Sequence, residues 1–239
     1  MPPIMQPALS ESECVWEFFG RRTDGFFVEV GANDPHAGSQ TWSLESKGWR
    51  GILVEPLERF QTVLKAARPR SQVFRAACGP PGHPATAEFF EAEASAHSGL
   101  RPHAVDAATQ YVSRETVRVL TLDELLAEAG HPQVDFISID TEGTQLDVLR
   151  GLDLQRHAPK LLLVEDHLYD FETHFHLRRK RYRLVKRTHS NNWYIPEGVP
   201  FRLTTPWERL RLWRKLWPGT PLRMVKFRRE RRALRAAGS

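Results

Sequence analysis

The sequence contains few cysteines and no long apolar run. Its two cysteines, Cys14 and Cys78, form no CxxC pair among the 239 residues. This scarcity argues against a disulfide framework or a cysteine-based zinc site and favours a cytoplasmic protein. The first residues lack a basic segment followed by an apolar one, so no signal peptide is expected. No apolar stretch reaches the roughly 18 residues that a membrane-spanning helix needs.

Charge is distributed unevenly along the chain. The net charge is only +5, but residues 168–239 hold 19 Lys and Arg against 5 Asp and Glu. Residues 1–167 hold 15 Lys and Arg against 24 Asp and Glu. Because 41% of the residues are hydrophobic, a sizeable core is expected beneath these charges. An acidic front and a basic back predict two different functional surfaces.

Short apolar runs alternate with helical spacing over the front two-thirds of the chain. The predicted strands are Phe26–Val30, Gly51–Val54, Gln72–Ala77, Val134–Ile139 and Lys160–Val164. The predicted helices between them are Leu57–Ala67, Thr121–Ala129 and Thr144–Leu149. This alternation indicates an α/β fold with a parallel sheet and helices on both faces.

Two further segments complete the expected organisation. Residues 79–118 are interpreted as a long connection whose Ala87–Phe90 and Val117–Leu120 pair as a hairpin. A basic helical segment ending at Arg181 is followed by two antiparallel strands, Tyr182–Arg187 and Asn192–Pro196. The two histidines of that helix, at 174 and 176, are expected on its surface.

Four predicted strands end in acids, namely Glu29, Glu55, Asp140 and Glu165. A single acid at such a position often only caps the next helix. In an open α/β sheet, however, ligands bind outside the carboxyl ends of the strands. Four acids at that edge therefore predict a binding site.

The first of these acids lies in EVGANDP, which is not the GxGxxG loop of dinucleotide sites. Glu29 precedes Gly31 by two residues and would repel a pyrophosphate, so NAD and FAD are disfavoured. A ligand with an amino group and a sulfonium charge suits this acid better, which indicates S-adenosylmethionine. Glu55, at the end of the next strand, is placed to accept hydrogen bonds from a ribose diol.

The runs VEVGANDP, GSQT, GWRGILVEP and VDFISIDTEGTQLDVLRGLD together resemble FkbM-type S-adenosylmethionine-dependent methyltransferases. The resemblance covers residues 24–196. It implies a Rossmann-like, seven-stranded class I methyltransferase sheet whose last strand is antiparallel. It also implies methyl transfer to oxygen, often of a sugar hydroxyl. The expected division is a helical lead-in at 1–23, a methyltransferase domain at 24–200 and a basic helical appendage at 201–239.

The resemblance also implies the cofactor residues, which are Glu29, Gly31, Asn33, Ser39, Thr41, Glu55, Pro56, Ala77, Cys78 and Asp140. In that mapping Glu29 lies at the methionine end and Glu55 at the ribose. Ala77 and Cys78 lie beside the adenine, and Asp140 lies between the methionine end and the acceptor.

Methyltransferase loops usually carry glycine at the positions of Asn33 and Pro35. Asn33 tolerates a left-handed conformation, whereas Pro35 cannot adopt one. The loop is therefore expected to leave the usual path at Pro35, as in a subgroup of this family. That departure leaves Ser39 and Thr41 as additional cofactor contacts.

Methylation of an alcohol needs a base or a metal to help remove its proton. The candidate catalytic residues are Asp140, Glu165, His167 and His189. A set of oxygen and nitrogen donors, Asp140, Glu142, Glu165 and His167, is a candidate site for Mg²⁺ or Mn²⁺. In the simpler alternative, Glu142 caps a helix, His167 lies on the surface and His189 is an ordinary turn residue.

The C-terminal segment interleaves tryptophan with arginine. Trp207, Leu210, Trp213 and Trp217 recur every three or four residues. They are typical either of a helix packed on the domain or of an interfacial helix on an anionic membrane. Binding to single-stranded nucleic acid is a third interpretation, but nothing in the front of the chain supports it.

The leading functional hypothesis is an O-methyltransferase of a hydroxyl-bearing acceptor, chiefly a carbohydrate, acting in the cytoplasm or at the inner face of the membrane. One alternative is a non-catalytic scaffold in a glycan-synthesis complex. A nucleic-acid methyltransferase is disfavoured because IDTEG replaces the [DN]PP[YFW] signature of amino-methyltransferases.

Overall fold

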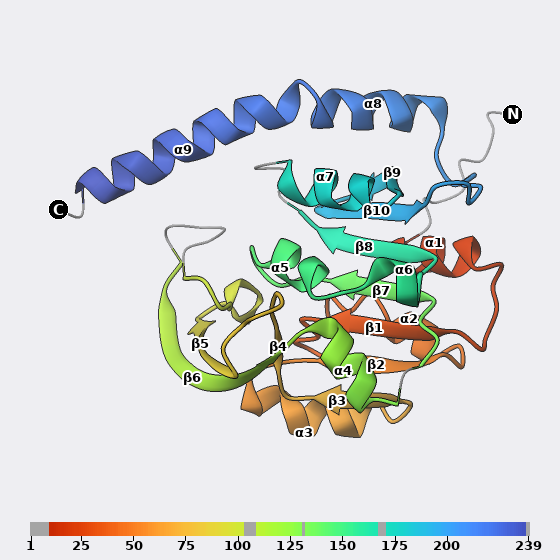
Figure 1. Ribbon diagram of the computed structural model, residues 1–239, viewed down its shortest axis with the longest axis horizontal. Coiled ribbons are helices and arrows are strands. Elements are labelled where there is room, and N and C mark those ends of the chain that lie inside the picture. The colour runs from red at the N-terminus through yellow and green to blue at the C-terminus, as the bar shows by residue number, and fades with distance from the viewer. Residues whose placement is uncertain (1–9, 103–108, 131, 167–170, 238–239) are drawn as a thin grey trace, which may run out of the picture.

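A computed structural model describes residues 10–102, 109–130, 132–166 and 171–237. Its centre is a seven-stranded sheet in the order β3-β2-β1-β7-β8-β10-β9 (Figure 1). The strands are β1 (Phe26–Val30), β2 (Arg50–Val54), β3 (Ser71–Phe74), β7 (Phe136–Ile139), β8 (Leu161–Glu165), β9 (Tyr182–Thr188) and β10 (Asn191–Pro196). Only β10 runs against its neighbours β8 and β9, whereas the other pairs are parallel. The predicted α/β sheet with an antiparallel last strand is confirmed.

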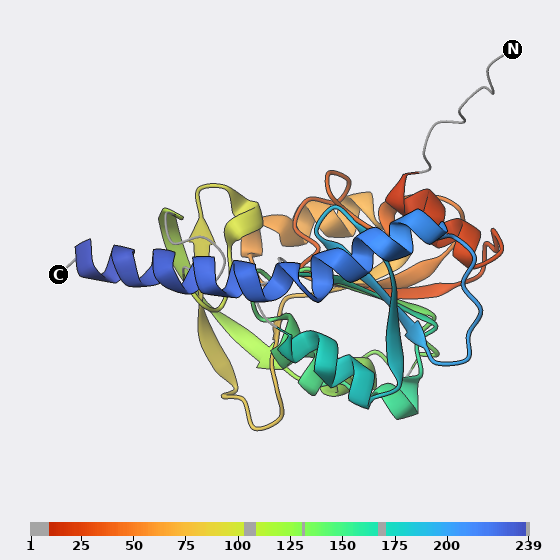
Figure 2. The ribbon, with the colours of Figure 1, turned by 90° about the horizontal axis from the view of Figure 1, so that it is seen from above.

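Helices cover both faces of this sheet (Figure 2). The first face carries α1 (Glu11–Phe18), α2 (Trp42–Glu45) and α3 (Glu58–Ala67), and the second carries α4 (Leu122–Glu128), α5 (Gln145–Arg150), α6 (Leu154–His157) and α7 (Glu172–Arg179). Successive residues of one strand point to opposite faces of the sheet. Phe27 therefore packs in the core beneath the helices of the first face, and Val28 packs in the core beneath the helices of the second face. Because both faces are buried, the central strands β1, β2, β7 and β8 are mostly apolar.

A second, three-stranded sheet contains β4 (Ala77–Cys78), β5 (Thr86–Ala92) and β6 (Tyr111–Leu120) in the order β4-β6-β5. Ala87 pairs with Val117 in antiparallel register, which confirms the predicted hairpin. A short 3₁₀ helix, η1 (Ser95–His97), lies in the connection between its strands.

The prediction of a single strand over Gln72–Ala77 is wrong. The chain leaves the central sheet after Phe74, and Ala77–Cys78 pairs with β6 of the second sheet. Arg75 marks the change, since its guanidinium contacts Glu58 and Glu115 outside the sheet. Apolar character alone does not reveal where a strand exchanges one partner for another.

The chain ends in two helices, α8 (Pro206–Leu216) and α9 (Gly219–Ala237), which lie along one side of the molecule (Figures 1 and 2). The start of α8 is fixed by a capping box between Thr205 and Glu208 and by Pro206 in the first turn. Across the described ranges, no helix combines the length and the apolar character needed to cross a bilayer.

The expectation of two surface histidines in α7 is wrong for His174. Its side chain is buried between Tyr194 of β10 and Trp217, which follows α8. Burial lowers the pKa of His174 and so favours the neutral ring. Local sequence patterns could not show this packing, because the segment that covers His174 comes from a distant part of the chain.

Candidate functional site

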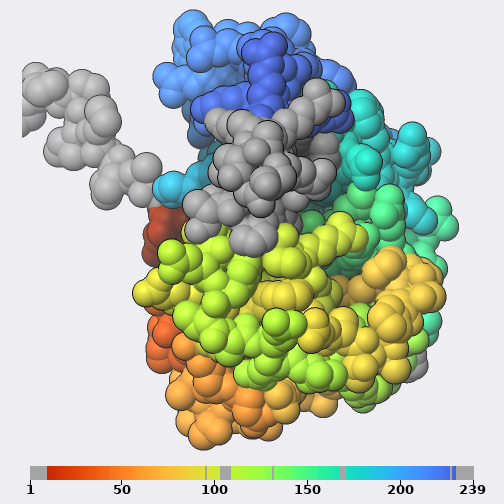
Figure 3. Space-filling view, turned by 90° about the vertical axis from the view of Figure 1, so that its left-hand side faces the viewer, coloured from red at the N-terminus to blue at the C-terminus, as the bar shows by residue number. Residues whose placement is uncertain are grey.

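A pocket lies at the carboxyl ends of β1, β2 and β7, and apolar side chains with a few polar groups line it. Small-molecule sites typically have this kind of lining. Figure 3 views the molecule from this side, where residues between about 80 and 120, in yellow and lime, form much of the surface. The second sheet and its connections thus wall a pocket whose floor is the edge of the first sheet.

Gly31 brings the loop after β1 against the end of β7. Its φ is +87°, and a Cβ at this position would lie 1.7 Å from the carbonyl oxygen of Asp140. The Gly31 N–H donates to the carbonyl of Val54 at 2.9 Å, which also ties the loop to β2. Only glycine fits this crossing, because both the conformation and the space exclude a side chain.

Glu29 holds the rest of that loop in place through hydrogen bonds. Its carboxylate accepts hydrogen bonds from the Ser39 hydroxyl at 2.9 Å, the Gln40 N–H at 2.8 Å and the Thr41 hydroxyl at 2.6 Å. Ser39 and Thr41 do not line the pocket, whereas Glu29 does. The structure therefore places the two hydroxyls, which the resemblance suggested as cofactor contacts, on the protein's own carboxylate.

Arg68, at the end of α3, is fully buried behind the same loop. Its guanidinium donates to Glu45 at 2.5 Å, to Thr41 at 2.7 Å, to Ser39 at 3.1 Å and to the carbonyl of Pro35 at 3.2 Å. It also lies 3.7 Å from a carboxylate oxygen of Glu29. The Arg68 guanidinium thus links both ends of the loop segment 35–41 to the buried carboxylates of Glu45 and Glu29.

Glu55 directly follows β2 and lines the pocket. One carboxylate oxygen accepts from the Asn33 N–H at 2.8 Å and the other from the Leu57 N–H at 2.9 Å. Burial raises the pKa of Glu55 to about 7, although both backbone donors oppose that shift. Asn33 holds a positive φ of 46°, and its side-chain oxygen is buried without a hydrogen-bond partner. The carboxylate and the amide together offer acceptors to a ligand.

The wall opposite the loop is apolar. Ala77 and Cys78 line it from β4, and Phe89 and Leu100 line it from the second sheet and its connection. Burial raises the pKa of the Cys78 thiol to about 12, so the thiol stays neutral. Pro56 lies in the lining next to Glu55.

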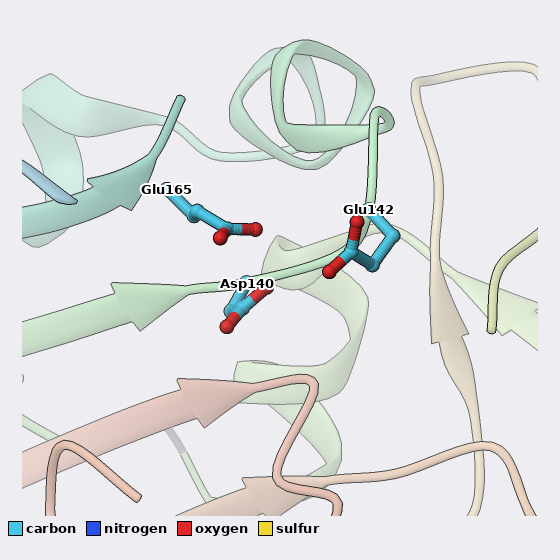
Figure 4. A group of neighbouring side chains, drawn as sticks. All are labelled: Asp140, Glu142 and Glu165. Atoms are coloured by element: carbon cyan, nitrogen blue, oxygen red, sulfur yellow. The ribbon is translucent and has the colours of Figure 1, made fainter. Parts of the chain in front are cut away.

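Three carboxylates gather where β7 and β8 end (Figure 4). Asp140 and Glu142 line the pocket, whereas Glu165 does not. Oxygens of Asp140, Glu142 and Glu165 lie within 4.8 Å of one another. Desolvation, a hydrogen bond with Glu165 and the neighbouring carboxylates raise the pKa of Asp140 well above its ordinary range. Desolvation and the charge of Glu165 raise the pKa of Glu142 to about 8. Such a group holds a proton at neutral pH or binds a cation.

Glu142 occupies a strained backbone position. Its φ is +46°, which is uncommon for a residue other than glycine. One of its carboxylate oxygens and the Thr141 hydroxyl are buried without a hydrogen-bond partner. Backbone strain of this kind is common at functional sites. Here the strained residue Glu142 and its neighbour Thr141 both line the pocket.

The two histidine candidates have different outcomes. His167 lies outside the described residues. His189 lies in the β9–β10 turn, which meets the end of β8 because Asn191 pairs with Glu165. Its side chain is exposed and does not line the pocket. The structure thus brings Asp140 and Glu165 together and leaves His189 apart.

Sequence reasoning missed several residues that shape the site. Arg68 resembled an ordinary basic residue at a helix end, where cations are common. Phe89, Ser98 and Leu100 lie in a segment interpreted as a connection, yet they form a pocket wall. The predicted hairpin of Ala87–Phe90 and Val117–Leu120 carried no information about the face that it covers.

A family model described as the Methyltransferase FkbM domain matches residues 29–184. A comparison with curated proteins found no match. One similar solved structure is the METTL16 MTase domain, with a TM-score of 0.42 and 11% identity over 77% of this chain and 64% of that one. This chain therefore spans less than two thirds of that domain.

Two precorrin methyltransferase structures are also similar. The precorrin-6y C5,15-methyltransferase from Geobacter metallireducens GS-15 has a TM-score of 0.39 and 12% identity over 82% of this chain and 90% of that one. The C-terminal domain of the Rhodobacter capsulatus precorrin-6Y C5,15-methyltransferase has a TM-score of 0.35 and 12% identity over 80% and 88%. At these scores no residue role or substrate is transferred from them.

Proposed function

This chain belongs to the FkbM methyltransferase family, and we propose that it transfers a methyl group from S-adenosylmethionine to a hydroxyl group of a carbohydrate acceptor. The observation that carries the proposal is the convergence of Gly31, Glu55 and Asp140 in one pocket. These residues follow three neighbouring strands, β1, β2 and β7, at their carboxyl ends. That edge is where ligands of open α/β sheets bind.

The lining fits the parts of this cofactor. Glu55 offers carboxylate oxygens to a ribose diol, and the wall at Ala77 and Cys78 is apolar enough for an adenine. Asn33 adds a buried amide oxygen without a partner. The acidic floor suits a ligand that carries an ammonium and a sulfonium. When bound, S-adenosylmethionine supplies a methyl group that is already activated by positively charged sulfur.

The protein's own residues then have two tasks, which are to align the acceptor and to receive its proton. In the transfer the hydroxyl oxygen would gain the methyl group as its bond to sulfur breaks, and the hydroxyl proton would pass to a carboxylate of the protein. Glu142, whose pKa is about 8, has the basicity of an effective general base near neutral pH. Asp140 and Glu165 share a hydrogen bond beside it.

A second candidate mechanism uses a divalent metal. The same three carboxylates offer only oxygen, which Mg²⁺ and Mn²⁺ prefer. Such an ion would lower the pKa of an acceptor hydroxyl and neutralise the acids. Treatment with EDTA followed by Mg²⁺ or Mn²⁺ decides between the mechanisms. Loss and recovery of activity support the metal, whereas unchanged activity in EDTA leaves the carboxylates as the base.

Calorimetry with S-adenosylmethionine tests the cofactor. The wild type should bind it, and Glu55→Ala should lose most of the affinity because the diol loses its acceptor. Glu58→Ala is a matched control, since Glu58 is an exposed acid three residues away that pairs with Arg75. Failure of the wild type to bind S-adenosylmethionine would contradict the proposal.

Transfer of a labelled methyl group into cell fractions tests the acceptor. Label in glycolipid or polysaccharide supports the proposal. Label in nucleic acid would favour a nucleic-acid methyltransferase instead. Cofactor binding without transfer into any fraction would favour a non-catalytic scaffold in a glycan-synthesis complex.

A further inference from the structure

We infer that the outer face of α8 and the start of α9 dock on an anionic lipid bilayer. Large apolar side chains are exposed there. Trp207 is 73% exposed, Leu210 54% and Trp213 59%, and Leu222 and Val225 of α9 are 73% and 51% exposed. Most of the exposed large apolar side chains in the described part of the chain lie on these two helices and their junction.

Helix α8 carries one apolar stripe, and the domain covers only its C-terminal end. Leu216 is buried, and Trp217 directly after the helix stacks on Phe171 with ring centroids 5.7 Å apart. Trp207, Leu210 and Trp213 recur every three residues and so continue this stripe toward the start of the helix. Their side chains stay exposed, whereas a helix that only covered the domain would bury them.

Basic residues flank the exposed apolar side chains. Residues 206–229 contain one acid and eight bases, which are Arg209, Arg211, Arg214, Lys215, Arg223, Lys226, Arg228 and Arg229. The acid, Glu208, is engaged in the cap with Thr205 and in an ion pair with Lys186. Tryptophan between arginines is typical of a helix in the interface plane, where the rings lie among headgroups and the cations meet anionic lipid.

The positive charge of α8 and α9 favours an anionic bilayer over a second copy of the protein as the partner of this surface. Two copies packed through this surface would bring like charges together, which opposes association. Anionic lipid supplies the opposite charge over the whole length of the helices, and its attraction increases with each Lys or Arg near the surface.

The position of the helices connects this surface to the pocket. The end of α9 extends past the edge of the sheet at which the parallel strands terminate (Figure 1), and in Figure 3 the blue helices stand above that side. A bilayer held by α8 and α9 would therefore lie beside the pocket. If the proposed transfer holds, the acceptor is a glycan that is anchored in that membrane.

Vesicle flotation of the full chain tests the inference. The wild type should float with phosphatidylcholine vesicles that contain phosphatidylglycerol, and not with phosphatidylcholine alone. The combined variant Trp207→Ser, Leu210→Ser and Trp213→Ser should bind at least about tenfold more weakly. Neutralising Arg211, Arg214 and Lys215 to Gln should weaken binding on the order of a hundredfold at low salt. Added salt should weaken the wild type.

A control variant carries Val63→Ser and Val112→Ser, which remove exposed apolar side chains elsewhere; it should float like the wild type. Calorimetry with S-adenosylmethionine on each variant shows whether the pocket is intact, and so separates failure of the docking surface from failure of the proposed function. Equal flotation of the wild type and the triple serine variant would overturn the inference. So would self-association or nucleic-acid binding through this face without flotation.

Discussion

Arg68 is the residue whose replacement probes most directly how the cofactor loop is held. We predict that Arg68→Met weakens S-adenosylmethionine binding although Arg68 does not line the pocket. Its guanidinium donates to the Pro35 carbonyl and to the hydroxyls of Ser39 and Thr41. Those three contacts span the segment that passes over Glu29. Methionine fills similar space but restores none of them.

The expected cost follows from what the substitution leaves behind. Arg68 has no exposed surface, and its partners Glu45 and Glu29 are 3% and 4% exposed. Removing one partner of a buried ion pair costs about 3–5 kcal/mol of stability because the remaining charge is uncompensated. Glu45 keeps donors from the Arg70 N–H and the Ser71 hydroxyl, both at 2.8 Å, so the lower end of that range is expected. Loss of the loop contacts should weaken cofactor binding at least about tenfold, or about 1.4 kcal/mol.

Urea unfolding and calorimetry measure these two effects separately. Arg22→Met is the matched control, since Arg22 pairs with buried Asp135 at 2.5 Å at the start of β7, the end of that strand opposite the pocket. It should lower stability and leave cofactor affinity unchanged. If Arg68→Met proves too unstable, Arg68→Lys keeps the charge but cannot reach all these acceptors, and should show the same change in affinity. Wild-type affinity in a folded Arg68 variant would refute the reasoning.

Three further predictions concern the pocket itself. Gly31→Ala should abolish cofactor binding in calorimetry because its Cβ would meet the Asp140 carbonyl at 1.7 Å, whereas Gly20→Ala, also at positive φ but in open space, should bind normally. Since burial raises the pKa of Glu55 from 4.5 to about 7, the folded state retains a proton that the unfolded chain loses. The stability of the wild type relative to Glu55→Gln should therefore be greatest below pH 4.5 and fall by roughly 3 kcal/mol as pH rises to about 7, as seen by urea unfolding. Cofactor affinity should change in the opposite sense, increasing through pH 7 as the carboxylate forms. Finally, the methylation rate should rise with pH through about 8, the pKa of Glu142, and a Glu142→Gln variant should lose this rise together with most of its rate.

Local patterns in the sequence were sufficient for the fold class and for the position of the site. Apolar runs that end in acids predicted the strands within a few residues, because strand burial and turn chemistry are encoded by neighbouring residues. The edge carrying Glu29, Glu55, Asp140 and Glu165 followed from the same runs, since parallel strands end together. Glycine at position 31 was also readable, because a loop that must approach another strand closely excludes a side chain.

What each of those residues contacts was decided only by the tertiary structure. Glu29 and Glu55 both follow an apolar run, yet Glu29 is saturated by Ser39, Gln40 and Thr41, whereas Glu55 receives two backbone N–H groups beside the pocket. The raised pKa of Glu142 depends on desolvation and on the charge of Glu165, which lies 23 positions further along the chain. Hydrogen bonds, desolvation and charge coupling act over a few ångströms in space, and chain separation does not report those distances. The sequence by itself therefore determined most of the strands and where their acids gather, while the packing of distant segments decided which acid holds the loop and which acids have raised pKa values.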